Sequence, residues 1–191
     1  MSATIAESDT NQAILNAAIH VFGRFGYKKC SMDELAASAK LSKQGLYLHF
    51  SSKEEIFAKA LTKYLDDGLL LAQKALSDTD LSLNQCLLGA LDAWFGRHID
   101  TFSPDSFDLL EASKHLLGGS LESYKSAFRE KMAKALDKSA EFNRSKSACN
   151  AREVAHVLFM CGLNWKEERL SRQEFLQKMR VCIRVCCRTK N

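Results

Sequence analysis

The sequence predicts an all-α protein of about nine helices. Apolar residues recur at intervals of three and four along most of the 191 residues, which is the spacing of one helix face. Short motifs typical of helix starts precede several of these repeats. A single proline and nine glycines supply few turns, which favours long helices over a sheet of many strands.

Three helices are expected in the first part of the chain. The first runs from about Thr10 to Phe25, and Gly26 directly after it is the residue type that commonly ends a helix in a left-handed conformation. Ser31 to Glu34 forms a capping box and begins a short second helix, and Ser42 can cap a short third one. Two short helices joined by a tight turn over about twenty residues have the dimensions of a helix-turn-helix.

Longer helices are expected after this motif. Ser52 to Glu55 is a second capping box, and the same signature recurs at Asn150 to Glu153 and at Ser171 to Glu174. Apolar repeats predict further helices over about 81–101, 106–117 and 120–142. The breaks between these three are Ser103-Pro104-Asp105 and Gly118-Gly119.

Composition and charge narrow the classes of function. The segment 24–53 holds six basic and two acidic residues, and the segment from 166 onward holds eight basic and three acidic ones, so two basic regions flank an acidic middle. The N-terminus has no signal-peptide pattern, and no apolar run is long enough for a spanning helix, so a cytoplasmic location is expected. Seven cysteines without zinc-type spacing indicate reduced thiols, and neither a metal nor a cofactor is expected.

The helix-turn-helix segment also carries a family resemblance. Residues 36–54 read A-A-S-A-K-L-S-K-Q-G-L-Y-L-H-F-S-S-K-E. This resembles the signature of the TetR (tetracycline-repressor-like) family of bacterial regulators, A-x-x-A-G-V-S-x-x-x-L-Y-x-H/Y-F-x-S-K-E. Lys40 stands where the family usually has glycine in the turn, so we expect the turn conformation to strain the residue there mildly.

The resemblance implies a two-domain organisation. Residues 1–52 would form the helix-turn-helix DNA-binding domain, and residues 53–191 a helical domain that binds an effector and dimerises. Two such chains would place their third helices in successive major grooves of double-stranded operator DNA, about 34 to 36 Å apart. The implied function is a sequence-specific transcriptional regulator, a repressor that a small apolar or aromatic molecule releases from DNA.

Ten residues are candidates for DNA contact. Lys43 and Gln44 lie in the first turn of the third helix, where their side chains can bond guanine and adenine edges. Gly45 removes a side chain where that helix would lie closest to DNA. The others would bind phosphate, extend the basic grip or cap the helix. The full set is Lys28, Lys29, Ser31, Ser42, Lys43, Gln44, Gly45, Tyr47, His49 and Lys53.

Two further residue sets are predicted in the remaining helices. The last two helices of each protomer would form a four-helix dimer bundle through Val154, Val157, Leu158, Cys161, Phe175, Met179 and Cys182. Aromatic residues and a few polar ones could line an effector pocket, although most aromatic side chains of such a body are plain core. The pocket set is Trp94, Phe95, Phe107, His115, Tyr124, Phe128 and Trp165.

Three alternatives compete with this interpretation. Cys182, Cys186 and Cys187 lie among Arg180, Arg184 and Arg188, which could lower a thiol pKa and make the same fold respond to oxidants or metals. An enzyme is not expected, because the chain lacks a glycine-rich phosphate loop, a His-x-x-x-His motif and a nucleophile motif. A helical protein-interaction module would bind DNA only weakly and without sequence preference.

Overall fold

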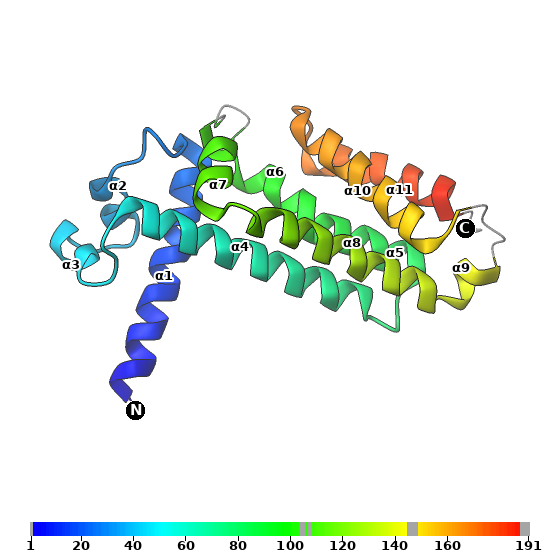
Figure 1. Cartoon of the computed structure of the whole chain (residues 1–191), viewed down its shortest axis with the longest axis horizontal. Coiled ribbons are helices and arrows are strands. Elements are labelled where there is room, and N and C mark those ends of the chain that lie inside the picture. Colours follow the sequence, from blue (N-terminus) through cyan, green and yellow to red (C-terminus); the bar gives the residue numbers. More distant parts are fainter. Residues whose placement is uncertain (1, 104–105, 107, 145–148, 188–191) are drawn as a thin grey trace. The chain divides into compact units, whose positions relative to one another are not determined.

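The computed structural model describes residues 2–103, 106, 108–144 and 149–187, and within these ranges the regular structure is helical (Figure 1). A π-helical turn, η1, spans Asp92–Gly96. The α-helices are α1 Ser2–Phe25, α2 Met32–Ser38, α3 Lys43–Tyr47, α4 Lys53–Leu76, α5 Leu83–Leu91, α6 Arg97–Thr101, α7 Asp108–Leu117, α8 Ser120–Lys138, α9 Ala140–Arg144, α10 Ala151–Glu167 and α11 Arg172–Cys187. The predicted all-α class is confirmed.

The chain forms two compact units. Unit 1 comprises Met1–Asp66 and Thr101–Leu121, and unit 2 comprises Asp67–Asp100 and Glu122–Asn191. The long helix α4 supplies its first part to unit 1 and its last part to unit 2. The division by function at residue 52 stays a prediction. No helix in the described ranges is long and apolar enough to cross a membrane.

Aromatic packing organises the core of unit 1. Phe22 of α1 is fully buried and meets Phe57 of α4 edge-on, with 4.9 Å between the ring centroids. Helix α1 ends at Phe25 as predicted, because Gly26 adopts a left-handed φ of 85°. The segment after α6 is tied to α1, since the Ser103 amide donates to the Gly23 carbonyl over 2.7 Å.

A larger apolar core holds unit 2 together. Helices α10 and α11 run side by side (Figure 1), and α11 also packs on α5. Phe128 of α8 is fully buried, and Trp94 stacks on it at 4.9 Å between the ring centroids. The fully buried members of this core include Leu87, Leu91, Phe128, Met132, Leu136, Leu158, Phe175 and Met179. The apolar stripes that predicted these helices are therefore the stripes that face this core.

Residues 83–101 contain a feature that periodicity did not predict. The single helix expected over 81–101 changes to π-type hydrogen bonding at Asp92–Gly96 and returns to α-helix at Arg97. Arg172, the first residue of α11, binds the Asp92 carboxylate through Nε at 2.6 Å and Nη2 at 2.9 Å. Its Nη1 donates to Asp100 at 2.6 Å. The guanidinium of Arg172 thus joins α11 to η1 through Asp92 and to α6 through Asp100.

The predicted helix starts are largely confirmed. Reciprocal capping hydrogen bonds form at Ser31, Asn150 and Ser171. At Ser52 the hydroxyl accepts from the Glu55 amide as predicted, but the Glu55 carboxylate accepts from Ser51 instead of Ser52. The structure adds a capping box at Ser82 that the sequence analysis missed.

The helix expected over 120–142 is divided in two. Helix α8 ends at Lys138 and α9 begins at Ala140. Ser139 between them accepts a hydrogen bond from the Phe142 amide through its hydroxyl at 3.3 Å, which is how an N-cap residue starts a new helix. The chain therefore has one helix more than the apolar repeat predicted in this stretch.

Gly162 offers a test of the packing in unit 2. A Cβ atom at this position would lie 2.5 Å from ring carbons of the buried Phe95. We expect Gly162→Ala to lower the free energy of unfolding by about 1 to 3 kcal/mol, because the core must shift to admit the methyl group. Urea unfolding followed by circular dichroism measures the change.

Gly119→Ala is the matched control for this prediction. A Cβ there would meet nothing within 4 Å, and Gly119 has no positive φ. Equal stability of the two variants would contradict the close packing of α10 against Phe95.

Candidate nucleic-acid interface

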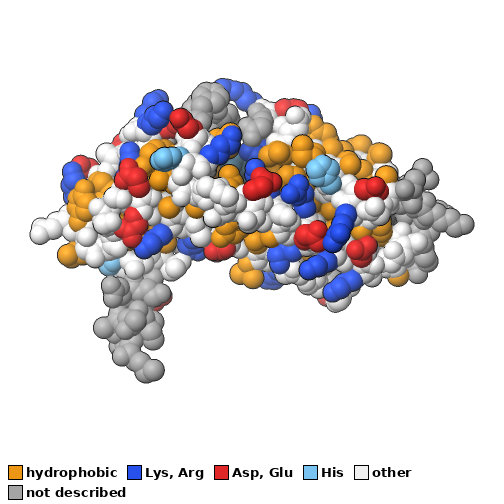
Figure 2. All heavy atoms as spheres, viewed as in Figure 1, with side chains coloured by type: hydrophobic (Ala, Val, Ile, Leu, Met, Phe, Trp, Pro, Cys, Tyr) orange, Lys and Arg blue, Asp and Glu red, His pale blue; other side chains and the backbone are white. Residues whose placement is uncertain are grey.

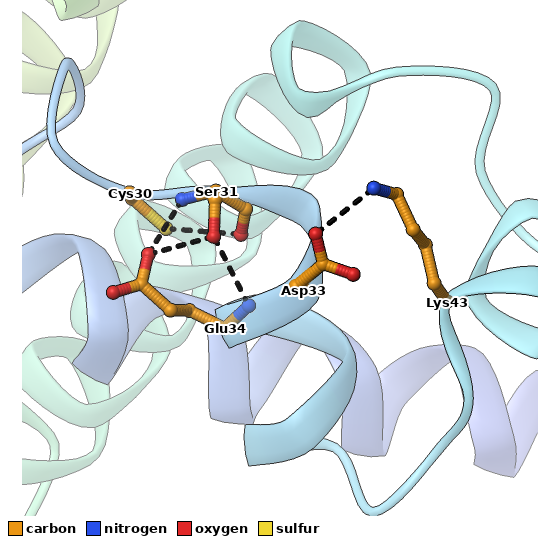
Figure 3. A network of polar contacts seen from close by, with 5 residues as sticks. All are labelled: Cys30, Ser31, Asp33, Glu34 and Lys43. Atoms are coloured by element: carbon orange, nitrogen blue, oxygen red, sulfur yellow. Dashed lines mark hydrogen bonds and ion pairs between the residues drawn. The ribbon is translucent and has the colours of Figure 1, made fainter.

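The start of α2 is fixed by a reciprocal cap (Figure 3). The Ser31 hydroxyl accepts from the Glu34 amide at 3.3 Å, and the Glu34 carboxylate accepts from the Ser31 amide at 2.7 Å. The Glu34 carboxylate also accepts from the Ser31 hydroxyl at 2.9 Å. These hydrogen bonds lower the pKa of Glu34. Ser31 is exposed, but its hydroxyl is engaged in the cap, so a phosphate contact from it would have to share that hydroxyl.

The turn between α2 and α3 contains a left-handed residue, Lys40, at the position where the sequence predicted mild strain. Lys40 has a φ of 59°, which an L-residue with a Cβ atom adopts at a cost. The Lys40 amide donates to Ala37 O at 3.1 Å, and the Leu41 amide donates to Ala36 O at 2.9 Å. This pair of hydrogen bonds is a Schellman motif, in which glycine is the usual left-handed residue.

Helix α3 is short and is anchored from one side. Ser42 caps it by accepting from the Gly45 amide at 3.0 Å. Leu46 is fully buried, and Phe50 just beyond the helix is buried as well. A Cβ on Gly45 would lie 3.2 Å from the Ser42 hydroxyl, so glycine at this position also makes room for the cap.

The opposite side of α3 presents an exposed polar face. Lys43, Gln44 and Tyr47 are all exposed, and 48% of Tyr47 is accessible. The Lys43 ammonium forms an ion pair with Asp33 at 2.9 Å, which joins α3 to α2 (Figure 3). Both partners of this pair are exposed, so a base or phosphate can displace Asp33 at little cost.

Leu48 is a residue that the sequence analysis missed. Leu48 is 81% accessible directly beside Tyr47, the highest value among the exposed large hydrophobic residues of the described part. The signature leaves this position variable, so the motif itself gave no signal. Leu48 becomes a candidate for DNA contact only in the structure, which shows its exposure beside Tyr47. Thymine methyl groups offer apolar contacts in the major groove.

The structure corrects the role predicted for Lys53. Its ammonium does not project outward but donates to Tyr27 O at 3.1 Å and to Cys30 O at 3.0 Å. It also lies 4.5 Å from the centroid of the Tyr27 ring. Two carbonyls and an aromatic face satisfy this ammonium, so Lys53 fixes the loop between α1 and α2 instead of holding a phosphate.

Tyr27 completes this contact. Its hydroxyl donates to the Glu54 carboxylate at 2.8 Å. Burial and the hydrogen bond to Glu54 raise the pKa of Tyr27 to about 12. Lys53 and Glu54 of the signature therefore both bind the loop between α1 and α2, which is a structural role.

The remaining DNA-contact candidates differ in whether their side chains are already bonded to other residues of the chain. His49 Nδ1 lies 2.8 Å from the Asn11 side-chain oxygen, so this ring joins α3 to α1. The Lys28 ammonium lies 3.3 Å from Glu111, and its amide donates to Asp108. Lys29 is exposed. The exposed positions Lys29, Lys43, Gln44, Tyr47 and Leu48 are thus the most open of this surface.

Comparison with known proteins assigns this segment to a family. The sequence model described as "Bacterial regulatory proteins, tetR family" matches residues 14–60, which include α2, α3 and the turn between them. Over this segment the chain is similar to regulators of the TetR family. The match covers the N-terminal segment alone and does not extend to the helices that follow α4.

Two curated relatives support the assignment over part of their length. The chain is 39% identical over 82 residues to the transcriptional activator FasR of Mycolicibacterium smegmatis, covering 43% of this chain and 37% of FasR. It is 32% identical over 109 residues to the transcriptional regulator YfiR of Bacillus subtilis, covering 56% of this chain and 53% of YfiR. The chain thus spans about a third to a half of the curated relatives that it matches.

A solved structure extends the likeness to the whole fold. AibR, solved in complex with isovaleryl coenzyme A and operator DNA, matches 95% of this chain and 100% of its own with a TM-score of 0.60. At 16% identity this likeness concerns the fold alone. The predicted arrangement of an N-terminal helix-turn-helix followed by a helical domain is confirmed.

The residues predicted to line a pocket lie in different surroundings where the structure describes them. Phe95 and Phe128 are buried and pack edge-on at 6.0 Å between centroids, so they are core residues and their predicted pocket role is corrected. Trp94 covers Phe128, and Lys178 lies over the Trp165 ring at 5.4 Å. His115 is exposed and belongs to unit 1, whereas the half-buried Tyr124 belongs to unit 2. Phe107 lies outside the described residues.

The predicted dimer surface also needs correction. Val154, Leu158, Phe175 and Met179 are buried in the core of this chain, so they cannot face a partner. Cys161 and Cys182 are half-buried and contact each other, with 3.8 Å between their sulfurs. Only Val157 of the predicted set is exposed, at 45%. Periodicity identified the apolar stripes of α10 and α11 but assigned them to the wrong partner.

The thiol-based alternative is not favoured. Burial, followed by the hydrogen bond to Cys161, raises the pKa of Cys182 to about 12, and burial raises the pKa of Cys187 to about 12 as well. Arg180 and Arg184 are exposed and do not lower these values, while Arg188 lies outside the described residues. The described residues also contain no group of three or more His, Cys, Asp or Glu placed to hold a metal. A high thiol pKa disfavours the reactive thiolate.

The strain at Lys40 gives a direct test of the turn geometry. We expect Lys40→Gly to raise the free energy of unfolding by up to about 1 kcal/mol, since glycine reaches the left-handed region without the Cβ penalty. Thermal unfolding of the purified protein measures this gain.

Lys40→Ala is the control for this substitution. Alanine removes the charge and the long side chain but keeps the Cβ atom, so it should not stabilise the turn. A gain with alanine as large as with glycine would show that side-chain charge, not backbone conformation, limits the stability of this turn.

Proposed function

We propose that this chain is a homodimeric, sequence-specific transcriptional regulator that represses its target until a small molecule releases it from operator DNA. Residues 1–52 bind DNA, and residues 53–191 bind the effector and dimerise. The observation that carries the proposal is the exposed face of α3, which displays Lys43, Gln44, Tyr47 and Leu48 on a helix anchored by the buried Leu46. The match of residues 14–60 to the TetR-family sequence model supports it.

The residues of this face have distinct tasks. Gln44 pairs with an adenine edge, and Lys43 leaves Asp33 to bond a guanine. Tyr47 donates its hydroxyl to a phosphate, which positions the helix without reading sequence. Leu48 contacts a thymine methyl group. Lys28 and Lys29 add electrostatic attraction to the backbone, which depends on salt concentration.

Effector control follows from a difference in affinity between two states. If the effector prefers a state whose recognition helices do not fit the operator, its binding weakens DNA binding, and DNA weakens effector binding by the same factor. AibR, whose fold this chain shares, has been solved with both an acyl coenzyme A and operator DNA. FasR is named an activator, so in vitro transcription from the target promoter tests the sign of regulation directly.

The proposed function also needs a dimerisation surface, for which α10 and α11 are the candidates. Val157 and Met160 of α10 are 45% and 46% accessible, and Val185 of α11 is 70% accessible. Figure 2 shows hydrophobic side chains gathered on the face over α10 and α11. Exposed apolar residues on two adjacent helices suit a four-helix bundle with a second copy.

DNA recognition is tested by fluorescence anisotropy on the intergenic DNA upstream of the protein's own gene. We expect wild type to prefer this DNA over a scrambled sequence by about 10³ or more. Gln44→Ala should reduce the preference about tenfold or more, because a bidentate base contact contributes about 1 to 3 kcal/mol of discrimination. Tyr47→Phe should weaken binding to both DNAs alike, because it removes a phosphate contact.

Lys138→Ala serves as the control in this experiment, since it removes an exposed lysine at the end of α8 and should change neither affinity nor preference. The proposal that α3 reads the DNA sequence through Gln44 would be wrong if Gln44→Ala kept the full preference for a DNA that wild type selects.

Dimerisation is tested with the double variant Val157→Glu/Met160→Glu. Two carboxylates in an apolar interface lose hydration without gaining partners, so the dimer dissociation constant should rise by at least about tenfold. Sedimentation velocity at several protein concentrations measures it. Leu110→Glu, which places a carboxylate at an exposed leucine of α7, should leave the dimer intact. An unchanged dimer in the double variant would rule out this surface.

A further inference from the structure

A groove in unit 2 is unlike the aromatic core beside it. It lies between α5 and α11 and has a volume of about 490 Å³, within the range of about 300 to 1,000 Å³ typical of small-ligand sites. None of its lining residues belonged to the predicted effector pocket. Its walls combine two arginines, three amide side chains and three aliphatic ones.

The charge of this groove is uncompensated. Arg180 and Arg184 lie one helical turn apart on α11, and neither makes a hydrogen bond or ion pair with any residue of the described part. No lining residue is acidic, and α5 contains no acidic residue. Glu174, the only carboxylate of α11, accepts from the Ser171 amide at 2.8 Å and from its hydroxyl at 2.7 Å.

This arrangement costs helix stability unless an anion is present. Like charges four residues apart on a helix repel each other. A carboxylate or phosphate between two guanidinium groups removes the repulsion and accepts bidentate hydrogen bonds from them. Gln177, one turn before Arg180 on α11, and Gln85 across the groove on α5 add polar side chains beside the anion.

The rest of the groove lining is partly apolar and favours a ligand that carries an apolar part besides its anion. Leu88 of α5 and Val181 of α11 line the groove, and half of the Val181 surface is accessible. An inorganic anion would leave this apolar surface in water, whereas a ligand with a short hydrocarbon part would cover it.

We propose that the groove between α5 and α11 binds a small acidic amphiphile. Its carboxylate or phosphate head pairs with Arg180 and Arg184, and its hydrocarbon part lies against Leu88 and Val181. The proposal rests on the proposed function in that it gives a ligand class to the segment 53–191, but binding to the full chain without DNA tests it separately from DNA recognition. It also differs from the aromatic pocket predicted from sequence in both place and chemistry.

Isothermal titration calorimetry of the full chain tests the site with four probes. Octanoate and octyl phosphate carry an acidic head and a short chain, octanol carries the chain alone, and inorganic phosphate carries the anion alone. We expect one saturable site per chain for at least one of the two amphiphiles. Which of the two binds more tightly identifies the head group. Octanol and inorganic phosphate should each bind at least about tenfold more weakly.

Two variants with the same change in charge locate the site. Arg180→Gln/Arg184→Gln should weaken amphiphile binding at least about tenfold. It should not lower the melting temperature of the ligand-free protein, because it removes a repulsion and neither arginine has a partner among the described residues to lose. Lys134→Gln/Arg152→Gln removes two charges from α8 and α10, outside the groove, and should bind like wild type.

Three results would overturn the proposal. Neither amphiphile binds wild type, both double variants bind alike, or octanol or inorganic phosphate binds as tightly as the amphiphiles. If the arginines instead face a second copy of the chain, the amphiphiles will not bind and Arg180→Gln/Arg184→Gln will change the dimer dissociation constant. Sedimentation velocity of the same samples detects that outcome.

Discussion

A helix of five residues is not stable on its own, and the proposed DNA-reading face depends on what holds α3 in place. Forming the first helical turn costs more entropy than its hydrogen bonds return, so tertiary contacts must supply the difference. Leu46 and Phe50 supply it through burial, and Ser42 caps the helix start. His49 attaches the helix end to Asn11 of α1. The exposed side of α3 contributes little to holding the helix, because its Lys43–Asp33 ion pair is exposed to solvent, and a recognition surface requires such freedom.

The family signature combines these two kinds of residue. Phe50 is buried, Lys53 binds two loop carbonyls, and Glu54 accepts the Tyr27 hydroxyl, so these signature positions preserve the fold. Tyr47 is exposed and remains available for DNA. Assigning a phosphate contact to every polar residue of the signature overestimates the DNA-binding surface, as Lys53 demonstrates.

Local sequence chemistry predicted the N-terminal part of the fold well. The end of α1 at Gly26, the cap at Ser31 and the strained turn at Lys40 each depend on a few neighbouring residues, and such signals can be read from the chain directly. The π-helical turn at Asp92–Gly96 could not be read in this way. It is accompanied by the ion pair between Asp92 and Arg172, which are 80 residues apart in the sequence.

The same limit explains the errors in the helical body. Periodicity shows that Leu158, Phe175 and Met179 share buried stripes, but not whether the cover comes from the same chain or from a second one. The aromatic residues have the same ambiguity, because a ring that fills a core and a ring that lines a cavity have identical sequence signals. Burial in three dimensions decides both cases, and it leaves Val157, Met160 and Val185 as the exposed apolar residues proposed for the dimer.

On helix α11, the basic residues next to the cysteines in the sequence do not determine the pKa of the thiols. Its cysteines and arginines alternate along the chain, yet Cys187 is buried while Arg180 and Arg184 lie on the exposed side. Burial therefore controls the thiols and raises their pKa, while the charge of the arginines acts elsewhere. The two guanidinium groups remain on a groove wall without a counterion. A basic tail that seemed to tune sulfur chemistry is thus better placed to bind an anion.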